Sequence, residues 1–223
     1  RLLAGTCGTG NLGAEIRVHK RIPVAGGMAG GSADAAATLV ACNQLWGTSL
    51  DTGQLHAVAA RLGADVPFLL HGGTAVGTGR GEKLRPVPVR GSFQWVLALS
   101  HHGLSTPAVF REFDRISPPQ PTGIDSGLLE ALADGDARRV GALLRNDLQR
   151  AAFNLQPELA DVLAMGGEAG ATGALVSGSG PTIAFLAGTK AVADAISDRL
   201  VLSSRVRAVR RAHGPVPGAR IVN

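Results

Sequence analysis

A glycine-rich run at residues 23–36 has the residue types best suited to chemistry on an anion. Its four glycines remove side chains, so backbone N–H groups can converge on a phosphate, and a following helix would add the positive end of its dipole. Ser32 could cap that helix or offer its hydroxyl to a phosphate or to Mg²⁺. A glycine run can also be a plain turn, but the strand expected before it and the alanine-rich helix after it favour anion binding. We predict phosphate contacts from Pro23, Val24, Ala25, Gly26, Gly27, Met28, Ala29, Gly30, Gly31, Ser32 and Ala33.

Two common nucleotide sites do not fit this run. A Walker loop requires Gly-Lys-Ser or Gly-Lys-Thr after the glycines, and the glycine spacing differs from that of the dinucleotide fingerprint. A second glycine segment, Val-Ser-Gly-Ser-Gly-Pro-Thr at residues 176–182, lies far downstream. Taken alone, it would be an ordinary turn between two strands.

Asp65 is the carboxylate that we single out for catalysis. It stands two residues before Pro67, so it could equally be the N-cap of a helix, and its sequence context does not decide between the two roles. Thr106 before Pro107 is ambiguous in the same way, since it resembles an N-cap followed by proline at the first helical position.

The elements that must position these residues alternate along the chain between strand and helix patterns. The alternation Ile16, Val18 and Ile22 predicts a half-buried strand, and Ser49 is the expected N-cap of a helix over 50–62. The order of elements predicts an α+β protein in two lobes, with domains at 1–102 and 103–223. The other expected elements are a helix at 32–46, a hairpin around 77–81, a strand at 93–100, a linker at 117–123, two or three helices over 127–170, strands at 174–177, 183–187 and 206–211, and a helix at 192–201.

Composition limits the classes of function. Of the 223 residues 45% are hydrophobic and 17% charged, which indicates a folded globular protein. The net charge of +5 comes from scattered basic residues without interleaved aromatic rings, so we expect no nucleic-acid partner. Cys7 and Cys42 have no metal or disulfide-framework spacing, nor do the histidines have metal-ligand spacing. No apolar run is long enough to span a bilayer, so we expect no membrane partner and a cytoplasmic location.

The two glycine segments together resemble the second and third motifs of the GHMP kinases, in the family's order. Lys20–Pro23, Leu62–Phe68, Gly77–Glu82, Asn146–Gln149 and Gly214–Arg220 narrow the resemblance to the branch that phosphorylates a cytidine-diphosphate-linked methylerythritol. The similarity runs from Lys20 to the C-terminus. It implies a two-lobed GHMP kinase fold, with an N-terminal lobe like a ribosomal-protein domain and a ferredoxin-like C-terminal lobe.

The resemblance also implies an activity and roles for residues. The protein would use ATP with Mg²⁺ to phosphorylate the 2-hydroxyl of that substrate, in the non-mevalonate route to isoprenoid precursors, as a monomer or weak homodimer. Asp65 would accept the proton of the substrate hydroxyl, while Thr106, Gly178 and Ser179 would lie near the substrate. Lys20 and Asn11 would lie near the nucleotide, although Lys20 could equally be an exposed strand residue. A homoserine or phosphomevalonate kinase, or a non-catalytic protein of the same fold, remains an alternative.

The sequence departs from the family at its beginning. The family's opening Pro-Ala-Lys-x-Asn-like motif, whose lysine stabilises the transferring phosphate, and its Gly-Tyr-His segment for the cytidine end are absent, and the chain contains no tyrosine. We expect these motifs to be missing from this sequence and not from the protein. Without the strands that carry them, the sheet of the N-terminal lobe would have a broken edge. A chain that truly lacked them would be inactive.

Overall fold

The computed structural model describes residues 1–8, 12–116 and 123–222. They form two compact units. The helical unit contains Arg1–Arg21, Ala29–Val87 and Pro215–Asn223, and the sheet unit contains Ile22–Met28 and Pro88–Gly214. The expected boundary between residues 102 and 103 stays a prediction about the two family domains. The expected linker at 117–123 falls almost wholly outside the described residues.

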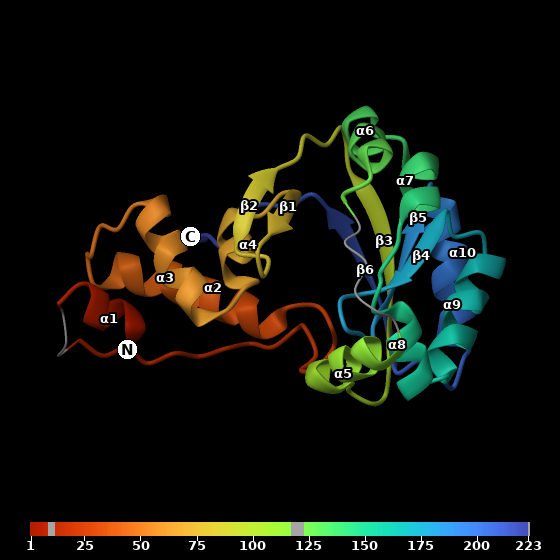
Figure 1. The fold of residues 1–223 in the computed structure, drawn as a ribbon, viewed down its shortest axis with the longest axis horizontal. Helices are drawn as coiled ribbons and strands as arrows, with labels where there is room; N and C mark the ends of the chain where they lie inside the picture. Colours follow the sequence, from red (N-terminus) through yellow and green to blue (C-terminus); the bar gives the residue numbers. More distant parts are fainter. Residues whose placement is uncertain (9–11, 117–122, 223) are drawn as a thin grey trace. The chain divides into compact units, whose positions relative to one another are not determined.

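Four helices and a hairpin make up the regular structure described in the helical unit, whose helices are red and orange in Figure 1. The helices α2, α3 and α4 pack on one another around a small apolar core that includes Leu39, Val58 and Val66. The expected helix at 32–46 is confirmed as α2, and the expected hairpin as β1 paired antiparallel with β2. The elements are α1 (Leu2–Thr6), α2 (Gly30–Leu45), α3 (Thr52–Leu62), α4 (Val66–His71), β1 (Ala75–Thr78) and β2 (Lys83–Pro86).

The strand expected at residues 16–22 is wrong. This stretch has no regular secondary structure, and Ile16 and Val18 are 56% and 51% exposed. Alternating residues give a segment two faces, but a strand also needs a neighbour to satisfy its backbone groups. No strand in the described part of the chain pairs with it.

The start of α3 corrects the expected cap. Asp51, not Ser49, is the N-cap, since the Gln54 N–H donates to its carboxylate at 2.8 Å and the Gln54 amide oxygen accepts from the Asp51 N–H at 2.9 Å. This reciprocal capping box satisfies two backbone donors, which a lone serine two residues earlier cannot do.

The C-terminal tail closes the helical unit. The Gly73 N–H donates to Val216 O and the Ala219 N–H to Leu69 O, both at 2.8 Å. A Cβ on Gly218 would lie 2.2 Å from Leu70 O, so only glycine permits this close approach. The tail therefore holds the end of α4, whose N-cap position is Asp65.

The sheet unit is a four-stranded antiparallel sheet with strand order β4-β5-β3-β6. Its strands are β3 (Phe93–Leu99), β4 (Gly173–Val176), β5 (Ile183–Ala187) and β6 (Ala208–Gly214). Helices separate β3 from β4 and β5 from β6, so the elements follow one another as β-α-β-β-α-β. This succession, together with the strand order in the sheet, defines a ferredoxin-like fold. The α+β fold class and the four strands expected in this region are thereby confirmed.

Helices cover both faces of the sheet (Figure 1). Helices α9 and α10 pack on the face that carries Val96 and Phe185, while α6 and α7 pack against Leu186 on the other. All of β5 is buried, which explains its continuous apolar sequence. Four helices, not two or three, fill residues 126–168, because Gly135 and two further breaks end them early. The helices are α5 (Thr106–Ile116), α6 (Ser126–Asp134), α7 (Ala137–Leu143), α8 (Gln149–Leu155), α9 (Glu158–Glu168) and α10 (Lys190–Val201).

Candidate active site

The glycine-rich run is a loop that leads into a helix, as the sequence predicts. Its first part, up to Met28, belongs to the sheet unit, and α2 begins at Gly30 in the helical unit. Ala25 and Ala29 have positive φ angles of 54° and 49°, which alanine rarely adopts. Such strained backbone concentrates at ligand-binding sites, where the surrounding structure maintains it.

The second glycine segment holds this loop within the sheet unit. The Ser177 hydroxyl donates to Gly27 O at 2.9 Å. A Cβ on Gly27 would lie 2.3 Å from Ser177 O and 2.6 Å from Gly180 O, so the two backbones touch directly. The side-chain amide of Asn146 supports the segment by donating to Val176 O and Gly178 O, both at 2.7 Å. The structure thus joins two motifs that are far apart in the sequence.

The loop keeps its backbone donors free. Among the described residues, no N–H group from Val24 to Met28 donates to a protein acceptor. Unpaired N–H groups on a glycine-rich loop are an anion-binding arrangement.

The first turn of α2 adds further unpaired donors. The N-cap is Ala29, which has no side chain to cap the helix, so the capping role considered for Ser32 is wrong. Ser32 lies inside the first turn, and its hydroxyl has no partner in the described part of the chain. It is therefore available to a phosphate oxygen or a hard cation.

Lys20 lies beside this first turn, in the same unit. Its ammonium forms an ion pair with Asp34 and contacts Gly30 O at 3.4 Å. It is not the strand residue considered as the alternative, because its segment is not a strand. Asn11 lies outside the described residues.

Asp65 occupies the N-cap position of α4, but its side chain makes no capping hydrogen bond. Its carboxylate is exposed and has no hydrogen-bond or ion-pair partner among the described residues. The purely structural role considered for Asp65 therefore finds no support. Helix α4 packs on α2, so Asp65 and the first turn of α2 belong to the same unit.

Thr106 and Ser179 lie together in the sheet unit, with their hydroxyl oxygens 2.7 Å apart. Thr106 is the first residue of α5 and not its cap, since the N–H groups of Ala108 and Val109 both donate to Ser105 O. The capping role considered for Thr106 is therefore wrong by one residue. Gly178 has a φ of 55°, and a Cβ on it would lie 3.0 Å from Gly27 O.

Phe110 is a further candidate residue that was not predicted from the sequence. It stands four residues after Thr106 on α5, so both lie on the same side of the helix, and its ring is 49% exposed. An exposed phenyl ring beside a hydroxyl is suited to stack on a nucleobase. The spacing Thr-x-x-x-Phe at the start of an expected helix was the available signal.

The helix α5 is tied to α8 by a strong carboxylate contact. Glu112 accepts from the guanidinium of Arg115 at 2.7 and 2.8 Å and from the Asn154 amide at 2.8 Å. The hydrogen bonds from Arg115 and then Asn154 hold the pKa of Glu112 at about 2.

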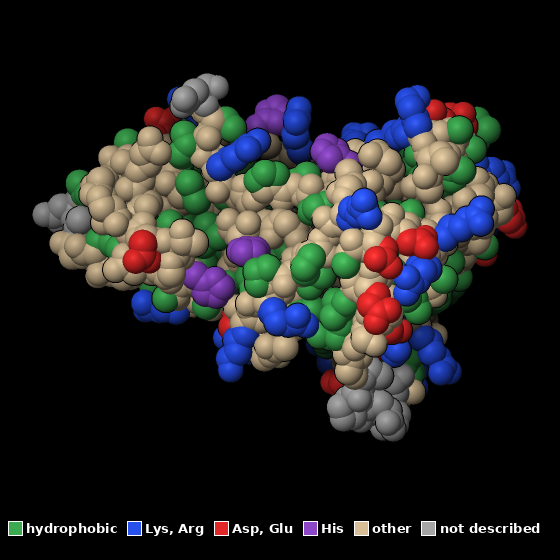
Figure 2. All heavy atoms as spheres, turned by 90° about the horizontal axis from the view of Figure 1, so that it is seen from above, with side chains coloured by type: hydrophobic (Ala, Val, Ile, Leu, Met, Phe, Trp, Pro, Cys, Tyr) green, Lys and Arg blue, Asp and Glu red, His purple; other side chains and the backbone are tan. Residues whose placement is uncertain are grey.

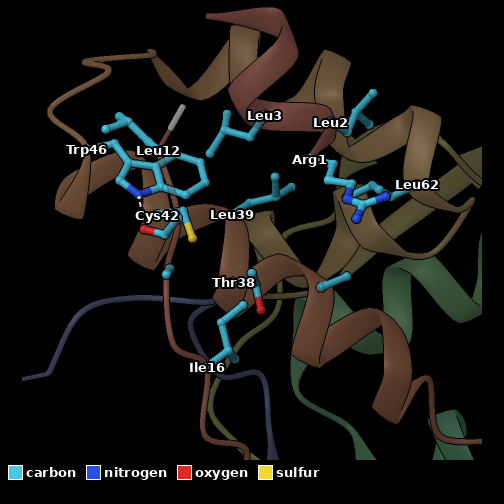
Figure 3. A pocket seen from close by; sticks show the side chains of 13 residues that line it. Arg1, Leu2, Leu3, Leu12, Ile16, Thr38, Leu39, Cys42, Trp46 and Leu62 are labelled. Carbon is cyan, nitrogen blue, oxygen red and sulfur yellow. Dashed lines mark hydrogen bonds between the residues drawn. The ribbon is translucent and has the colours of Figure 1, made fainter. Parts of the chain in front are cut away.

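An apolar pocket of about 490 Å³ opens in the helical unit (Figure 3). Leu3, Leu39 and Trp46 line it, and the Trp46 indole donates to Gly13 O at 3.2 Å. Its described lining contains no carboxylate, and the Thr38 hydroxyl on its wall already donates to Asp34 O. It therefore lacks the groups that phosphoryl transfer needs.

Basic residues of the sheet unit are interspersed with acidic ones on the surface seen in Figure 2. In the densest basic group, Arg205 contacts Asp161 at 3.4 Å and Arg211 pairs with Asp194. The hydrogen bonds from Lys190 and then Arg211 lower the pKa of Asp194. No helix that the structure describes is long and apolar enough to cross a membrane.

Comparison with known proteins matches both parts of the chain. The model of the GHMP kinases N terminal domain matches residues 1–73, and that of the GHMP kinases C terminal domain matches residues 128–203. A 4-diphosphocytidyl-2-C-methyl-D-erythritol kinase from Thermobifida fusca is 58% identical over 212 residues, which are 94% of this chain and 69% of that protein. The same kinase from Nocardia farcinica is 55% identical, with the same coverage.

Solved structures agree with these matches. A crystal structure of 4-(cytidine 5'-diphospho)-2C-methyl-D-erythritol kinase is 34% identical, with a TM-score of 0.72 over 87% of this chain and 68% of that chain. A homoserine kinase from Cytophaga hutchinsonii shares the fold, with 22% identity and a TM-score of 0.71 over 90% of this chain and 69% of that chain. The glycine-rich loop with its unpaired backbone donors fits the class that these relatives identify, the small-molecule phosphotransferases. The chain belongs to the GHMP kinases, a family of ATP-dependent kinases.

Proposed function

We propose that this protein transfers the γ-phosphoryl group of ATP to the 2-hydroxyl of 4-diphosphocytidyl-2-C-methyl-D-erythritol. The observation that carries the proposal is the 58% identity to a kinase of that name over 94% of the chain. The reaction belongs to the non-mevalonate route to isoprenoid precursors. We expect it to run in the cytoplasm, in a monomer or weak homodimer, without nucleic acid or membrane.

The phosphate groups of ATP would bind the glycine-rich loop. The unpaired N–H groups of Gly27, Met28 and the first turn of α2 would donate to the β- and γ-phosphate oxygens. Lys20, which pairs with Asp34 beside that turn, would lie near the nucleotide. The contact between Gly27 and Ser177 supports this role, because it fixes the loop before the ligand arrives.

Asp65 would accept the proton of the substrate hydroxyl. The hydroxyl oxygen attacks the γ-phosphorus, the bond to the β-phosphate oxygen breaks, ADP leaves, and the proton passes to the carboxylate. A carboxylate without a structural partner is free to take this role. Thr106, Gly178 and Ser179 would contact the substrate, and Phe110 would stack on its cytosine.

Mg²⁺ would enter with ATP. Among the described residues, no group of three or more His, Cys, Asp or Glu side chains could hold a metal by itself. The free Ser32 hydroxyl fits a hard cation that phosphate oxygens already coordinate. Mg²⁺ would supply charge neutralisation on the phosphates, while the chain's own residues bind and orient them.

The substrate is tested by incubating the intact protein with Mg-ATP and each of three acceptors: the cytidine-linked tetritol, homoserine and phosphomevalonate. Mass spectrometry should find phosphate added to the cytidine-linked tetritol alone. Phosphate on another acceptor would keep the kinase class and reject this substrate. An absence of product with all three, from a protein that binds ATP, would favour a non-catalytic role.

A further inference from the structure

A small polar pocket lies behind the phosphate loop, wholly within the sheet unit. It has a volume of about 100 Å³. Its walls are Pro23–Gly26 of the loop, Leu99–Gly103 at the end of β3, Pro181 and Thr182 of the second glycine segment, and Arg207 before β6. A nucleoside or a tetritol needs a larger volume, but one tetrahedral ion fits.

Arg207 gives the pocket a positive charge that no acidic group neutralises. Its backbone N–H donates to Leu99 O at 2.8 Å, which fixes its position at the rim. Its guanidinium has no ion pair or hydrogen bond with another described residue, in contrast to the neighbouring Arg205 and Arg211. Among the described residues, no carboxylate lines the pocket, whereas the residues His101 and His102 do.

Thr182, which also lines the pocket, supplies a buried hydroxyl. The residue is only 1% exposed, and its hydroxyl has no partner in the part of the chain that the structure describes. No fully buried side-chain oxygen or nitrogen there lacks a partner, so the small exposed part of Thr182 includes its hydroxyl. The Ser177 N–H donates to Thr182 O at 2.8 Å and holds the residue in place.

The loop adds donors to the same space. The N–H groups of Ala25 and Gly26 have no protein acceptor among the described residues, and both residues line the pocket. The strained φ of 54° at Ala25 is maintained at this wall. A guanidinium, a hydroxyl and loop N–H groups around a space without carboxylates form a site for a small oxyanion.

We propose that this pocket binds one free oxyanion of the phosphate class, in addition to the phosphates of the nucleotide. The bound ion bridges Arg207 and Thr182 to the back of the loop and stabilises the left-handed conformation of Ala25. The proposal does not depend on the kinase activity, because it concerns the nucleotide-free protein.

Calorimetric titration of the intact, nucleotide-free protein with inorganic phosphate tests this site. Arg207→Gln should weaken phosphate binding about tenfold or more, since it removes a charge-assisted contact. Thr182→Val should weaken it about three- to tenfold, while Thr182→Ser, which keeps the hydroxyl, should not. Arg210→Gln is the matched control, because Arg210 lies on β6 outside the pocket. This variant should bind phosphate as tightly as the wild type does.

Several results would overturn the proposal. One is an absence of phosphate binding by the wild type. Another is an equal loss of phosphate affinity in Arg207→Gln and Arg210→Gln. The third is unchanged phosphate affinity in both Arg207→Gln and Thr182→Val. The titration is repeated with a saturating non-hydrolysable ATP analogue. Retained binding supports a separate site, whereas displacement would show that phosphate had occupied the nucleotide's own position.

Discussion

At the residue scale, two aspartates at helix starts differ in what their carboxylates contact. Asp51 accepts from the N–H of Gln54 and caps α3, whereas Asp65 stands at the same position of α4 and caps nothing. A carboxylate at an N-cap without a capping bond contributes little to folding. Stability measurements can therefore test whether Asp65, unlike Asp51, is free of a structural role, as its proposed catalytic role requires.

Alanine substitution should therefore affect the two positions differently. Asp51→Ala should lower the free energy of unfolding by about 1 kcal/mol through loss of its cap. Asp65→Ala should change it by less than about 0.5 kcal/mol, as at an ordinary surface position. Urea unfolding of both variants measures this, and an equal loss at Asp65 would restore its structural role.

Gly27 is the residue at which the two glycine segments meet. Gly27→Ala puts a Cβ against Ser177 O and Gly180 O at a φ of 72°, so we expect a loss of about 1–3 kcal/mol in stability. Gly167→Ala is the matched control, because a Cβ there meets nothing within 4 Å inside α9. It should leave stability unchanged or raise it by up to about 1 kcal/mol. Similar denaturant midpoints for Gly27→Ala and the wild type would refute the close contact.

At the element scale, the sequence predicts elements whose signals are local. The helix at α2 and the strands of the sheet unit follow from apolar spacing and glycine stops, and the structure contains all of them. The stretch at 16–22 fails because strand formation depends on a partner, which alternation does not reveal. The expected caps Ser49 and Thr106 are wrong, because the hydrogen bonds that begin these helices go to Asp51 and to the backbone oxygen of Ser105.

The contacts of the site were harder to predict than its residues. Sequence pattern locates the loop and the second glycine segment, but the Ser177–Gly27 bond joins residues too far apart for any local signal. Arg207 looked like one of several scattered arginines, and only its place in the lining of the assembled pocket distinguishes it. Burial of Thr182 likewise depends on the assembled sheet.

The link between α5 and α8 should depend on pH. The pKa of Glu112 is 4.5 in the unfolded chain and about 2 in the folded protein. Its hydrogen bonds therefore stabilise the fold fully above pH 4.5. That contribution is lost as the pH falls from 4.5 toward about 2. Glu112→Gln should lower Tm at about pH 7, and the difference from wild type should shrink by about pH 3. A difference independent of pH would contradict the assignment.

The C-terminal tail should stabilise α4. Gly218→Ala places a Cβ against Leu70 O, so it should displace the tail and break the Ala219–Leu69 hydrogen bond. Hydrogen exchange at the amide of Ala219 should then accelerate by about tenfold or more. Gly214→Ala, with nothing within 4 Å of its Cβ, is the control. Unchanged exchange at Ala219 in Gly218→Ala would contradict this role of the tail.

At the scale of the whole molecule, the family follows from both family models, while the substrate follows from the relatives. Homoserine and mevalonate kinases share the fold at 20–22% identity, so the fold alone does not choose a substrate. The relatives that match at 50–58% identity are kinases of a cytidine-linked tetritol. We therefore propose phosphoryl transfer to that substrate, and we assign the role of the base to Asp65.

The most direct test is transfer of a labelled γ-phosphate from ATP to 4-diphosphocytidyl-2-C-methyl-D-erythritol by the intact protein and its Asp65→Asn variant. The wild type should form labelled product, and the variant should lose about 10²- to 10⁴-fold in kcat while retaining its Tm and its binding of ATP. Near-normal turnover by Asp65→Asn would contradict this mechanism. So would a wild-type protein that transfers no label to the substrate.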